Sequence, residues 1–190
     1  MRTAELNRKT KETDISIKLS LDGGEVEIAT GIGFFDHMLN SFAVHGGFGL
    51  KIKASGDLHV DAHHTVEDVG IVLGKAFAAA VNTSKVARFG SFVLPMDEAL
   101  VSCALDISGR PYLVFNGELP QERCGEFDSC LCVEFFRAFA VNSGVTLHIN
   151  IEYGDNAHHI IEAAFKAAAH SMRIATRERA EGVLSTKGVL

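Results

Sequence analysis

A five-residue pattern of potential metal ligands occurs twice in the sequence. The first copy is His63-His64-x-x-Glu67 and the second copy is His158-His159-x-x-Glu162. Imidazole and carboxylate groups without cysteine suit open or octahedral sites for divalent ions such as Mn, Fe or Zn, rather than a closed thiolate zinc site. A single short pattern is often a coincidence, whereas a repeated one is much less so. Each copy is therefore a candidate metal site.

Both copies open segments in which apolar residues recur with helical periodicity, so each pattern is expected in the first turns of a helix. Residues three and four apart are neighbours on a helix, and we expect each glutamate to lie beside both histidines of its copy. Adjacent residues diverge by about 100°. The two histidines of a pair are therefore expected to serve two different metals. For either copy alone, solvated or capping histidines remain the alternative.

Composition sets limits on the class of protein. The chain has 190 residues, of which 47% are hydrophobic and 22% charged, as expected for a globular protein with a substantial core. Its net charge of -6 and interspersed signs give no basic stripe, so nucleic acid and anionic membranes are poor partners. A polar N-terminus and the lack of an 18-residue apolar run predict a cytoplasmic protein.

The four cysteines are predicted to be reduced, structural thiols, because they lack paired CxxC spacing. They are Cys103, Cys124, Cys130 and Cys132.

Alternation and turn residues give the order of elements in the first half. The predicted elements are a β-hairpin over 15–28, a helix over 34–44, strands over 48–52 and 58–60, and the first motif helix. This order is β-β-α-β-β-α. The helix is expected to end at Gly46-Gly47.

The second half, from near Arg88, follows a similar plan. The predicted elements are strands over 89–94, 99–107 and 112–115, a helix over 129–141, a strand over 145–151, and the second motif helix. Since both halves end in a strand, a polar link and a motif helix, we infer an internal duplication. The predicted fold class is α+β, with two similar lobes that each have a β-sheet covered on one face by helices.

The expected domain organisation is a single domain, 1–190, made of two pseudo-repeats. These cover about 1–86 and 87–180, followed by a C-terminal tail, 181–190. The tail could be a frayed terminus. Alternatively, Ser185-Thr186-Lys187 could form a hook that binds an anion.

Six stretches together carry a family resemblance. They are Thr10-Lys11-Glu12-Thr13, Phe34-Phe35-Asp36-His37-Met38-Leu39, Asp61-Ala62-His63-His64-Thr65-Val66-Glu67-Asp68, Asp106-Ile107-Ser108-Gly109-Arg110-Pro111, Asn156-Ala157-His158-His159-Ile160-Ile161-Glu162-Ala163 and Ser185-Thr186-Lys187-Gly188. The chain thereby resembles the imidazoleglycerol-phosphate dehydratase family of histidine biosynthesis, in its monofunctional form, since no room is left for a fused phosphatase domain. The combination is specific, although each motif alone would be weak.

The resemblance implies a duplicated α+β fold, two Mn(II) ions per active site and a homo-oligomer of 24 subunits built from trimers. It also implies that metal ligands come from different subunits. The implied ligands are His37, His63, His64, Glu67, Glu134, His158, His159 and Glu162. Glu134 is a departure, because some relatives have histidine there. Glu134 occupies the second-half counterpart of His37 and is therefore kept as a candidate ligand. The alternative is that Glu134 is an ordinary solvated glutamate on a helix.

The remaining histidines are expected to have other roles. His59, His148 and His170 are predicted to be structural. His45 precedes two glycines at a helix end, where a capping role suffices.

The resemblance also implies a hydro-lyase that converts imidazole glycerol phosphate to imidazole acetol phosphate through a metal-bound imidazolate. The implied phosphate-binding residues are Arg88, Arg110, Lys166, Ser185 and Lys187. Lys166 has independent support, because it lies four residues after Glu162 on the same helix face. Solvation is the default for the two arginines at strand edges. Glu12 is the candidate for proton transfer beside the substrate ring. For Glu12, the alternative is an exposed glutamate at the start of a strand. The predicted catalytic residues are Glu12, Glu67 and Glu162.

Two other classes of protein remain possible. A dinuclear metallohydrolase acting on a small phosphate ester also uses histidine and carboxylate ligands. Asp61 and Asp68 flank the first motif, but Asn156 and Ala163 stand at these places in the second copy, which weakens that reading. A metal-storage shell would have no use for the other family motifs.

Overall fold

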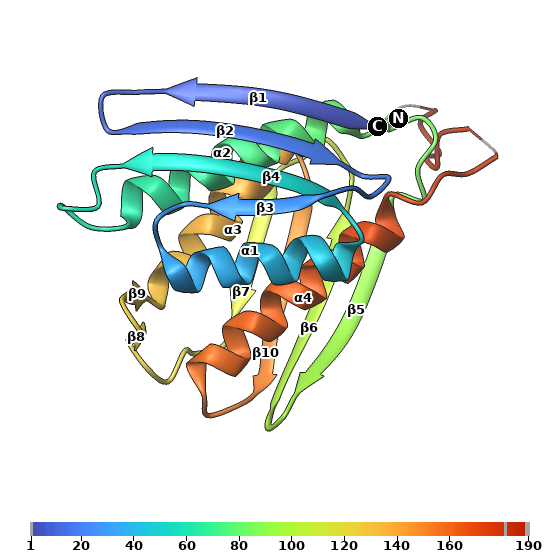
Figure 1. Ribbon diagram of the computed structural model, residues 1–190. Helices are drawn as coiled ribbons and strands as arrows, with labels where there is room; N and C mark the ends of the chain where they lie inside the picture. The colour runs from blue at the N-terminus through green and yellow to red at the C-terminus, as the bar shows by residue number, and fades with distance from the viewer. Residues whose placement is uncertain (1, 181, 189–190) are drawn as a thin grey trace.

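The computed structural model describes residues 2–180 and 182–188. The helices are α1 (Gly33–Gly46), α2 (His63–Ala80), α3 (Cys130–Ser143) and α4 (Ala157–Ala175). The strands are β1 (Thr3–Lys9), β2 (Thr13–Ser20), β3 (Val26–Ala29), β4 (Gly49–Gly56), β5 (Phe89–Met96), β6 (Ala99–Asp106), β7 (Tyr112–Asn116), β8 (Arg123–Cys124), β9 (Phe127–Asp128) and β10 (Thr146–Tyr153). Apart from the short β8–β9 pair, the two halves share the order β-β-β-α-β-α (Figure 1).

The two large sheets have equivalent topologies. The first has the strand order β1-β2-β4-β3 and the second has the order β5-β6-β10-β7. In each sheet the first two strands form an antiparallel hairpin, and the third strand runs parallel to the fourth. The expected fold class, an internally duplicated α+β unit, is confirmed. The residue boundaries of the two pseudo-repeats stay a prediction.

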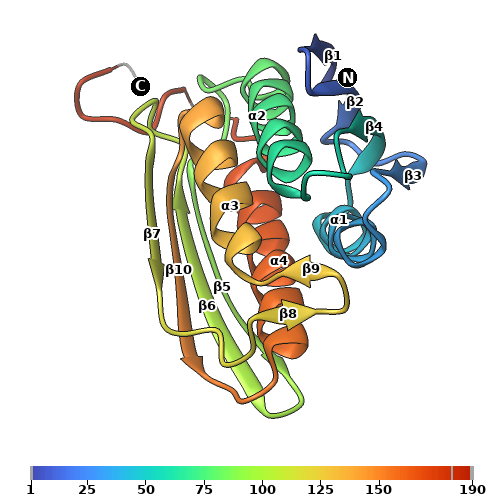
Figure 2. The ribbon, with the colours of Figure 1, turned by 90° about the vertical axis from the view of Figure 1, so that its left-hand side faces the viewer.

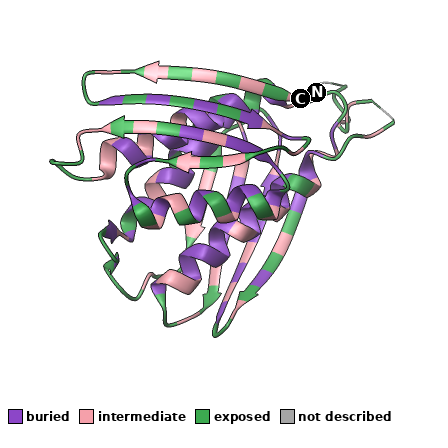
Figure 3. Cartoon of the chain, in the orientation of Figure 1, coloured by how far each residue is buried: buried purple, intermediate pink, exposed green. Residues whose placement is uncertain are grey.

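The helices lie between the sheets, as the turned view shows (Figure 2). On the first sheet, α2 packs against β1 and β2; on the second, α4 packs against β5 and β6. Alternate residues of β2, including Ile15, Ile17 and Leu19, are buried under α2, while their neighbours face outward (Figure 3). Each sheet is thus covered on one face, as expected.

The two halves join through helix contacts, because α2 packs on α3 and α1 packs on α4. Gly70 and Gly74 allow the close approach of α2 and α3, since a Cβ at either position would lie within 2.8 Å of a carbonyl oxygen of α3. Aromatic rings fill the middle of the core. Phe135 of α3 lies 5.4 Å from Phe35 of α1 and 5.0 Å from Phe165 of α4, measured between ring centroids. The motif helices therefore stand on a rigid common core.

Three predictions about strands are wrong. Residues 15–28 do not form a hairpin, because β4 lies between β2 and β3; the hairpin partner of β2 is β1. Residues 58–60 form an exposed turn instead of a strand. The predicted order of the first half, β-β-α-β-β-α, is therefore corrected to β-β-β-α-β-α. The prediction missed β1 because it is an edge strand of largely polar, half-exposed residues.

Other expectations hold. The helices over 34–44 and 129–141 correspond to α1 and α3, and both motifs lie in the first turns of their helices. The four cysteines are free thiols, and all but Cys130 are buried. None of the helices in the described part of the chain combines the length and apolar character that crossing a membrane requires. The cytoplasmic location stays a prediction.

Candidate functional site

The second motif meets α1 at the start of α4. Asn156 caps this helix, its side-chain oxygen accepting the backbone N–H of His158 at 2.9 Å. One turn later, Glu162 places Oε2 3.2 Å from Nε2 of His158 and 3.2 Å from Nε2 of His37 on α1. The ligand atoms of these three residues all lie within 4.8 Å of one another. The fold thereby brings a predicted ligand of the first half to the motif of the second half. We call this set the α4 cluster.

Glu162 is buried and its charge is balanced by a lysine. Its side chain is 8% exposed, and its Oε1 lies 2.8 Å from Nζ of Lys166 on the next turn. Burial opposes ionisation of Glu162, but the hydrogen bond and charge of Lys166 outweigh it, so the pKa of this carboxyl lies below its ordinary value. Lys166 therefore holds one oxygen while the other faces the two histidines. A cavity of about 390 Å³ is lined by His37, Glu162 and Lys166, together with Ser41 and His45.

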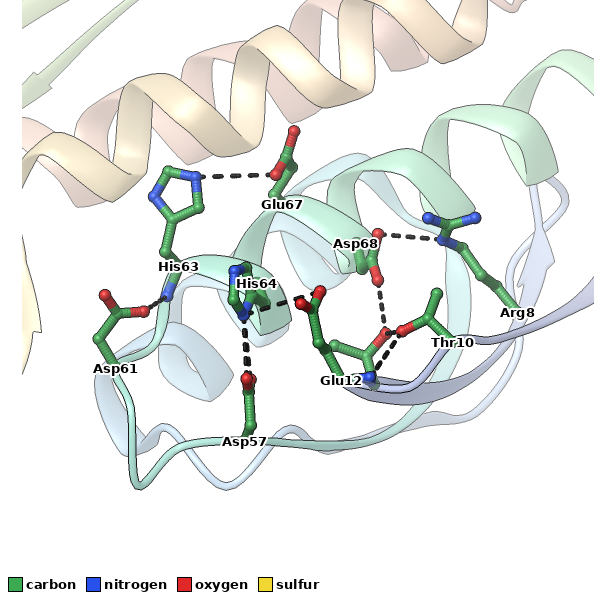
Figure 4. A network of polar contacts seen from close by, with 10 residues as sticks. Arg8, Thr10, Glu12, Asp57, Asp61, His63, His64, Glu67 and Asp68 are labelled. Carbon is green, nitrogen blue, oxygen red and sulfur yellow. Dashed lines mark hydrogen bonds and ion pairs between the residues drawn. The ribbon is translucent and has the colours of Figure 1, made fainter.

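The first motif opens α2, where its two histidines face different partners (Figure 4). His63 Nε2 lies 3.7 Å from Glu67 Oε2. His64 turns the other way, with Nδ1 3.0 Å from Oδ2 of Asp57 and 3.9 Å from Oε2 of Glu12 (Figure 4). The hydrogen bond to Asp57 raises the pKa of His64 above its ordinary value. We call these five residues the α2 cluster.

The histidines of each pair diverge, as predicted. The ring centroids are 6.2 Å apart in the first pair and 6.0 Å apart in the second, and the rings are nearly perpendicular in both. In each copy the glutamate contacts the first histidine, at 3.7 Å from Glu67 to His63 and at 3.2 Å from Glu162 to His158. Glu162 contacts His158, whereas His159 places Nδ1 2.7 Å from Oε2 of Glu98. The β5–β6 turn supplies this carboxylate, a partner that helical spacing cannot indicate.

A basic cleft of about 850 Å³ lies at the other end of α4. It is lined by Arg88, Arg110 and Arg179 and by tail residues 182–188, which include Ser185 and Lys187. Arg88 donates to both oxygens of Asp106 and to the carbonyl of Leu184, which ties the tail to β6. The expectation of a solvated Arg88 is therefore wrong: its side chain is 13% exposed. Arg110 keeps a 67% exposed side chain that can bind an anion.

The other candidates have simpler surroundings. Glu134 is the fifth residue of α3, as His37 is the fifth of α1, and it forms an ion pair with Arg137 outside the α4 cluster. His45 contacts His170 at 3.3 Å, and burial lowers the pKa of both imidazoles. His148 lies on the exposed face of β10.

Sequence reasoning missed two carboxylates of the site, Asp57 and Glu98. Neither is part of a helical pattern, and both are brought to the histidines by the packing of turns. Position within the repeat is the signal that could have indicated Glu98, because the β5–β6 turn is the counterpart of the β1–β2 turn that carries Glu12.

The two clusters suit a hard or borderline divalent cation. Their donors are imidazole nitrogens and carboxylate oxygens. Three of the four thiols are buried elsewhere in the core, and burial raises the pKa of Cys103 to about 12. The clusters start different helices, and both views place these starts apart (Figures 1 and 2). One chain therefore offers two separate partial sites.

Comparisons with known proteins identify the family of the chain. The family model described as imidazoleglycerol-phosphate dehydratase matches residues 30–172. The imidazoleglycerol-phosphate dehydratase of Acetivibrio thermocellus is 58% identical over 193 aligned positions, covering 100% of this chain and 99% of that protein. The imidazoleglycerol-phosphate dehydratase of Thermoanaerobacter pseudethanolicus is 57% identical, and the alignment covers 100% of both chains.

Solved structures extend the similarity to the fold. Imidazoleglycerol-phosphate dehydratase from Pyrococcus furiosus has a TM-score of 0.87 at 42% identity, with 97% of this chain and 100% of that chain covered. The Staphylococcus aureus structure has a TM-score of 0.86 at 40% identity, with 93% and 99% covered. With both sequence and fold matching over nearly the full length, the chain belongs to the imidazoleglycerol-phosphate dehydratase family of hydro-lyases.

Proposed function

We propose that the chain catalyses the metal-dependent dehydration of imidazole glycerol phosphate to imidazole acetol phosphate in histidine biosynthesis. The observation that carries this proposal is the α4 cluster, in which His37, His158 and Glu162 bring their ligand atoms within 4.8 Å of one another. Its donors fit Mn(II), and two ions per site would match the diverging histidine pairs. When bound, the metal would supply Lewis-acid stabilisation of negative charge on the substrate ring.

Two different sets of residues would bind the two ends of the substrate. Arg110, Ser185 and Lys187 line the basic cleft and can bind the phosphate through charge-assisted hydrogen bonds. Lys166 keeps Glu162 ionised and oriented beside the two histidines. A phosphate held in this way limits the positions of the carbon chain, which lowers the entropic cost of reaching the reactive geometry.

Glu12 is the residue we assign to proton transfer. It lies in the turn between β1 and β2, where Thr10 Oγ1 accepts its backbone N–H and so fixes the turn. Its side chain is 56% exposed and lies close to His64, so it can reach a substrate bound at the α2 cluster. A carboxylate there can remove the carbon-bound proton and return a proton to the departing hydroxyl group. Glu67 and Glu162 are the other two carboxylates of the proposed catalytic group.

A complete site requires more than one chain. Backbone N–H of Arg88 donates to the carbonyl of Ala175, so the basic cleft lies at the C-terminal end of α4, whereas Glu162 is in its first turns. At 1.5 Å per residue, Glu162 and Ala175 are about 20 Å apart along the helix. This exceeds the length of a small phosphorylated imidazole. We therefore infer a homo-oligomer with sites shared between subunits, and the 24-subunit assembly of trimers is the form that the family resemblance favours.

The test combines metal removal with product analysis. The chelated protein should lose activity and regain it on addition of Mn(II), with imidazole acetol phosphate formed and no free phosphate released. Full activity in a rigorously metal-free preparation would contradict the metal role. Release of phosphate would instead favour the metallohydrolase, which the residues Asn156 and Ala163 already disfavour.

A further inference from the structure

The four motif histidines fall into two kinds according to the ring nitrogen that meets a carboxylate. His63 and His158 each direct Nε2 to the glutamate of the same motif, at 3.7 Å and 3.2 Å. His64 and His159 instead direct Nδ1 to a carboxylate outside the motif. The distances are 3.0 Å from His64 to Asp57 and 2.7 Å from His159 to Glu98.

A carboxylate at Nδ1 determines the tautomer of the ring. An ionised carboxylate only accepts hydrogen bonds, so Nδ1 carries the proton and Nε2 keeps its lone pair. Histidine ligands of metals usually donate their second N–H to such a partner, which also fixes the ring orientation. Asp97 lies 3.7 Å from Nε2 of His159, too far for a hydrogen bond, so this nitrogen remains available.

The two supporting carboxylates come from elements that are not equivalent in the duplicated fold. Asp57 follows β4 in the link to α2, whereas Glu98 lies in the turn between β5 and β6. The first-half counterpart of that second turn carries Glu12, which stands farther from its histidine, at 3.9 Å. Because the same Nδ1 contact is reached from two unrelated loops, common ancestry of the halves does not explain it.

The surroundings of Glu98 show that its position is well defined. It follows Asp97, whose φ of 48° lies in the left-handed region that non-glycine residues rarely adopt. Glu98 also accepts the backbone N–H of Asn156, the capping residue of α4, at 3.0 Å. A strained turn thus joins the hairpin to the start of the motif helix.

We propose that Asp57 and Glu98 are positioning residues that orient His64 and His159 to present Nε2 to the catalytic metals. This role deepens the metal-dependent function proposed above and rests on it. It also separates the two carboxylates near His64: Asp57 orients the ring, which leaves Glu12 available to the substrate.

The test is metal binding by the full-length protein, measured for Asp57→Asn and Glu98→Gln. Each variant removes one charge and keeps the size of the side chain. Loss of a carboxylate behind a histidine ligand typically weakens metal affinity about 10- to 100-fold. We expect a loss of this size in Mn(II) titrations followed by calorimetry, and a changed absorption spectrum in the Co(II)-loaded protein. Asp57→Glu should recover part of the affinity.

The controls are exposed carboxylates near the same elements. Asp14→Asn on β2 removes a partner of Lys9, and Glu152→Gln on β10 removes a partner of Ser102. Both should bind Mn(II) as the wild type does. Thermal unfolding of the metal-free variants should match the wild type within a few degrees, which separates a positioning role from general destabilisation.

The outcomes distinguish this role from the proposed function. If the wild type takes up Mn(II) and Asp57→Asn and Glu98→Gln bind it equally well with unchanged Co(II) spectra, the positioning role is wrong and the metal-dependent function stands. If the wild type itself takes up no Mn(II), the proposed function fails and the positioning role fails with it.

Discussion

Replacing Lys166 by methionine should destabilise the metal-free protein, because it removes the cation that balances a buried carboxylate. The side chains of Glu162 and Lys166 are 8% and 18% exposed, and their charged atoms are 2.8 Å apart. Breaking a fully buried ion pair on one side costs about 3–5 kcal/mol. Since Lys166 is partly exposed and two histidines remain beside Glu162, we expect a loss of about 2–3 kcal/mol.

Methionine is a suitable replacement because it is unbranched and has nearly the helix propensity of lysine. For a chain of this length, the expected loss lowers Tm by roughly 5–10 °C. The assay is thermal unfolding in the presence of chelator at a fixed protomer concentration, because oligomer stability depends on concentration.

A double-mutant cycle and a surface control make this prediction specific to the ion pair. Adding Glu162→Gln to Lys166→Met should cost less than Glu162→Gln alone, because the unpaired charge is then gone. Lys75→Met, at an exposed position of α2, is the matched control and should change Tm little. If Lys166→Met and Lys75→Met unfold at the same temperature, Lys166 does not stabilise Glu162, and its place beside that carboxylate has another cause.

The remaining predictions test the cleft, the assembly and the core. Truncating Lys187 or Arg110 to alanine should raise KM roughly tenfold to a hundredfold in steady-state assays, since a charged hydrogen bond contributes about 1.5–3 kcal/mol; an unchanged KM would exclude the residue from the phosphate site. Chelation should convert the proposed large assembly to trimers and Mn(II) should reverse this, as followed by light scattering, because a metal shared between subunits would stabilise the assembled state; an active, metal-replete monomer would contradict shared sites. Gly90→Ala should lower Tm strongly, because its Cβ would collide with the carbonyl oxygen of Ser171, whereas Gly33→Ala, with no neighbouring atom within 4 Å, should not.

The sequence predicts the helices of this fold better than its strand pairings. Helical periodicity depends on neighbours three and four residues away, so the motif helices are predicted locally. Pairing depends on partners that are distant in sequence. The alternation at Ile17 and at Ile28 correctly indicates two strands, but it cannot show that β4 enters between them. Alternation also fails at Leu58 and Val60, which are apolar yet exposed in a turn.

Some features of the candidate site are also predicted by local helix geometry, whereas others depend on packing. The divergence of the paired histidines follows from helix geometry, and the structure agrees with it. The place of His37 beside Glu162 follows from the packing of α1 on α4, which no local pattern reveals. Asp57 and Glu98 belong to links whose positions are set by the sheets. Family resemblance supplied the set of candidate ligands, but it did not indicate which histidine each carboxylate would meet.

The two motif copies have the same spacing, but their glutamates have different surroundings. In α4, Lys166 follows Glu162 by one turn and balances its buried charge. The equivalent position in α2 is Ile71, and the side chains of His63 and Glu67 are 44% and 46% exposed. These half-exposed ligands are the ones that a second subunit would complete in the shared site proposed above.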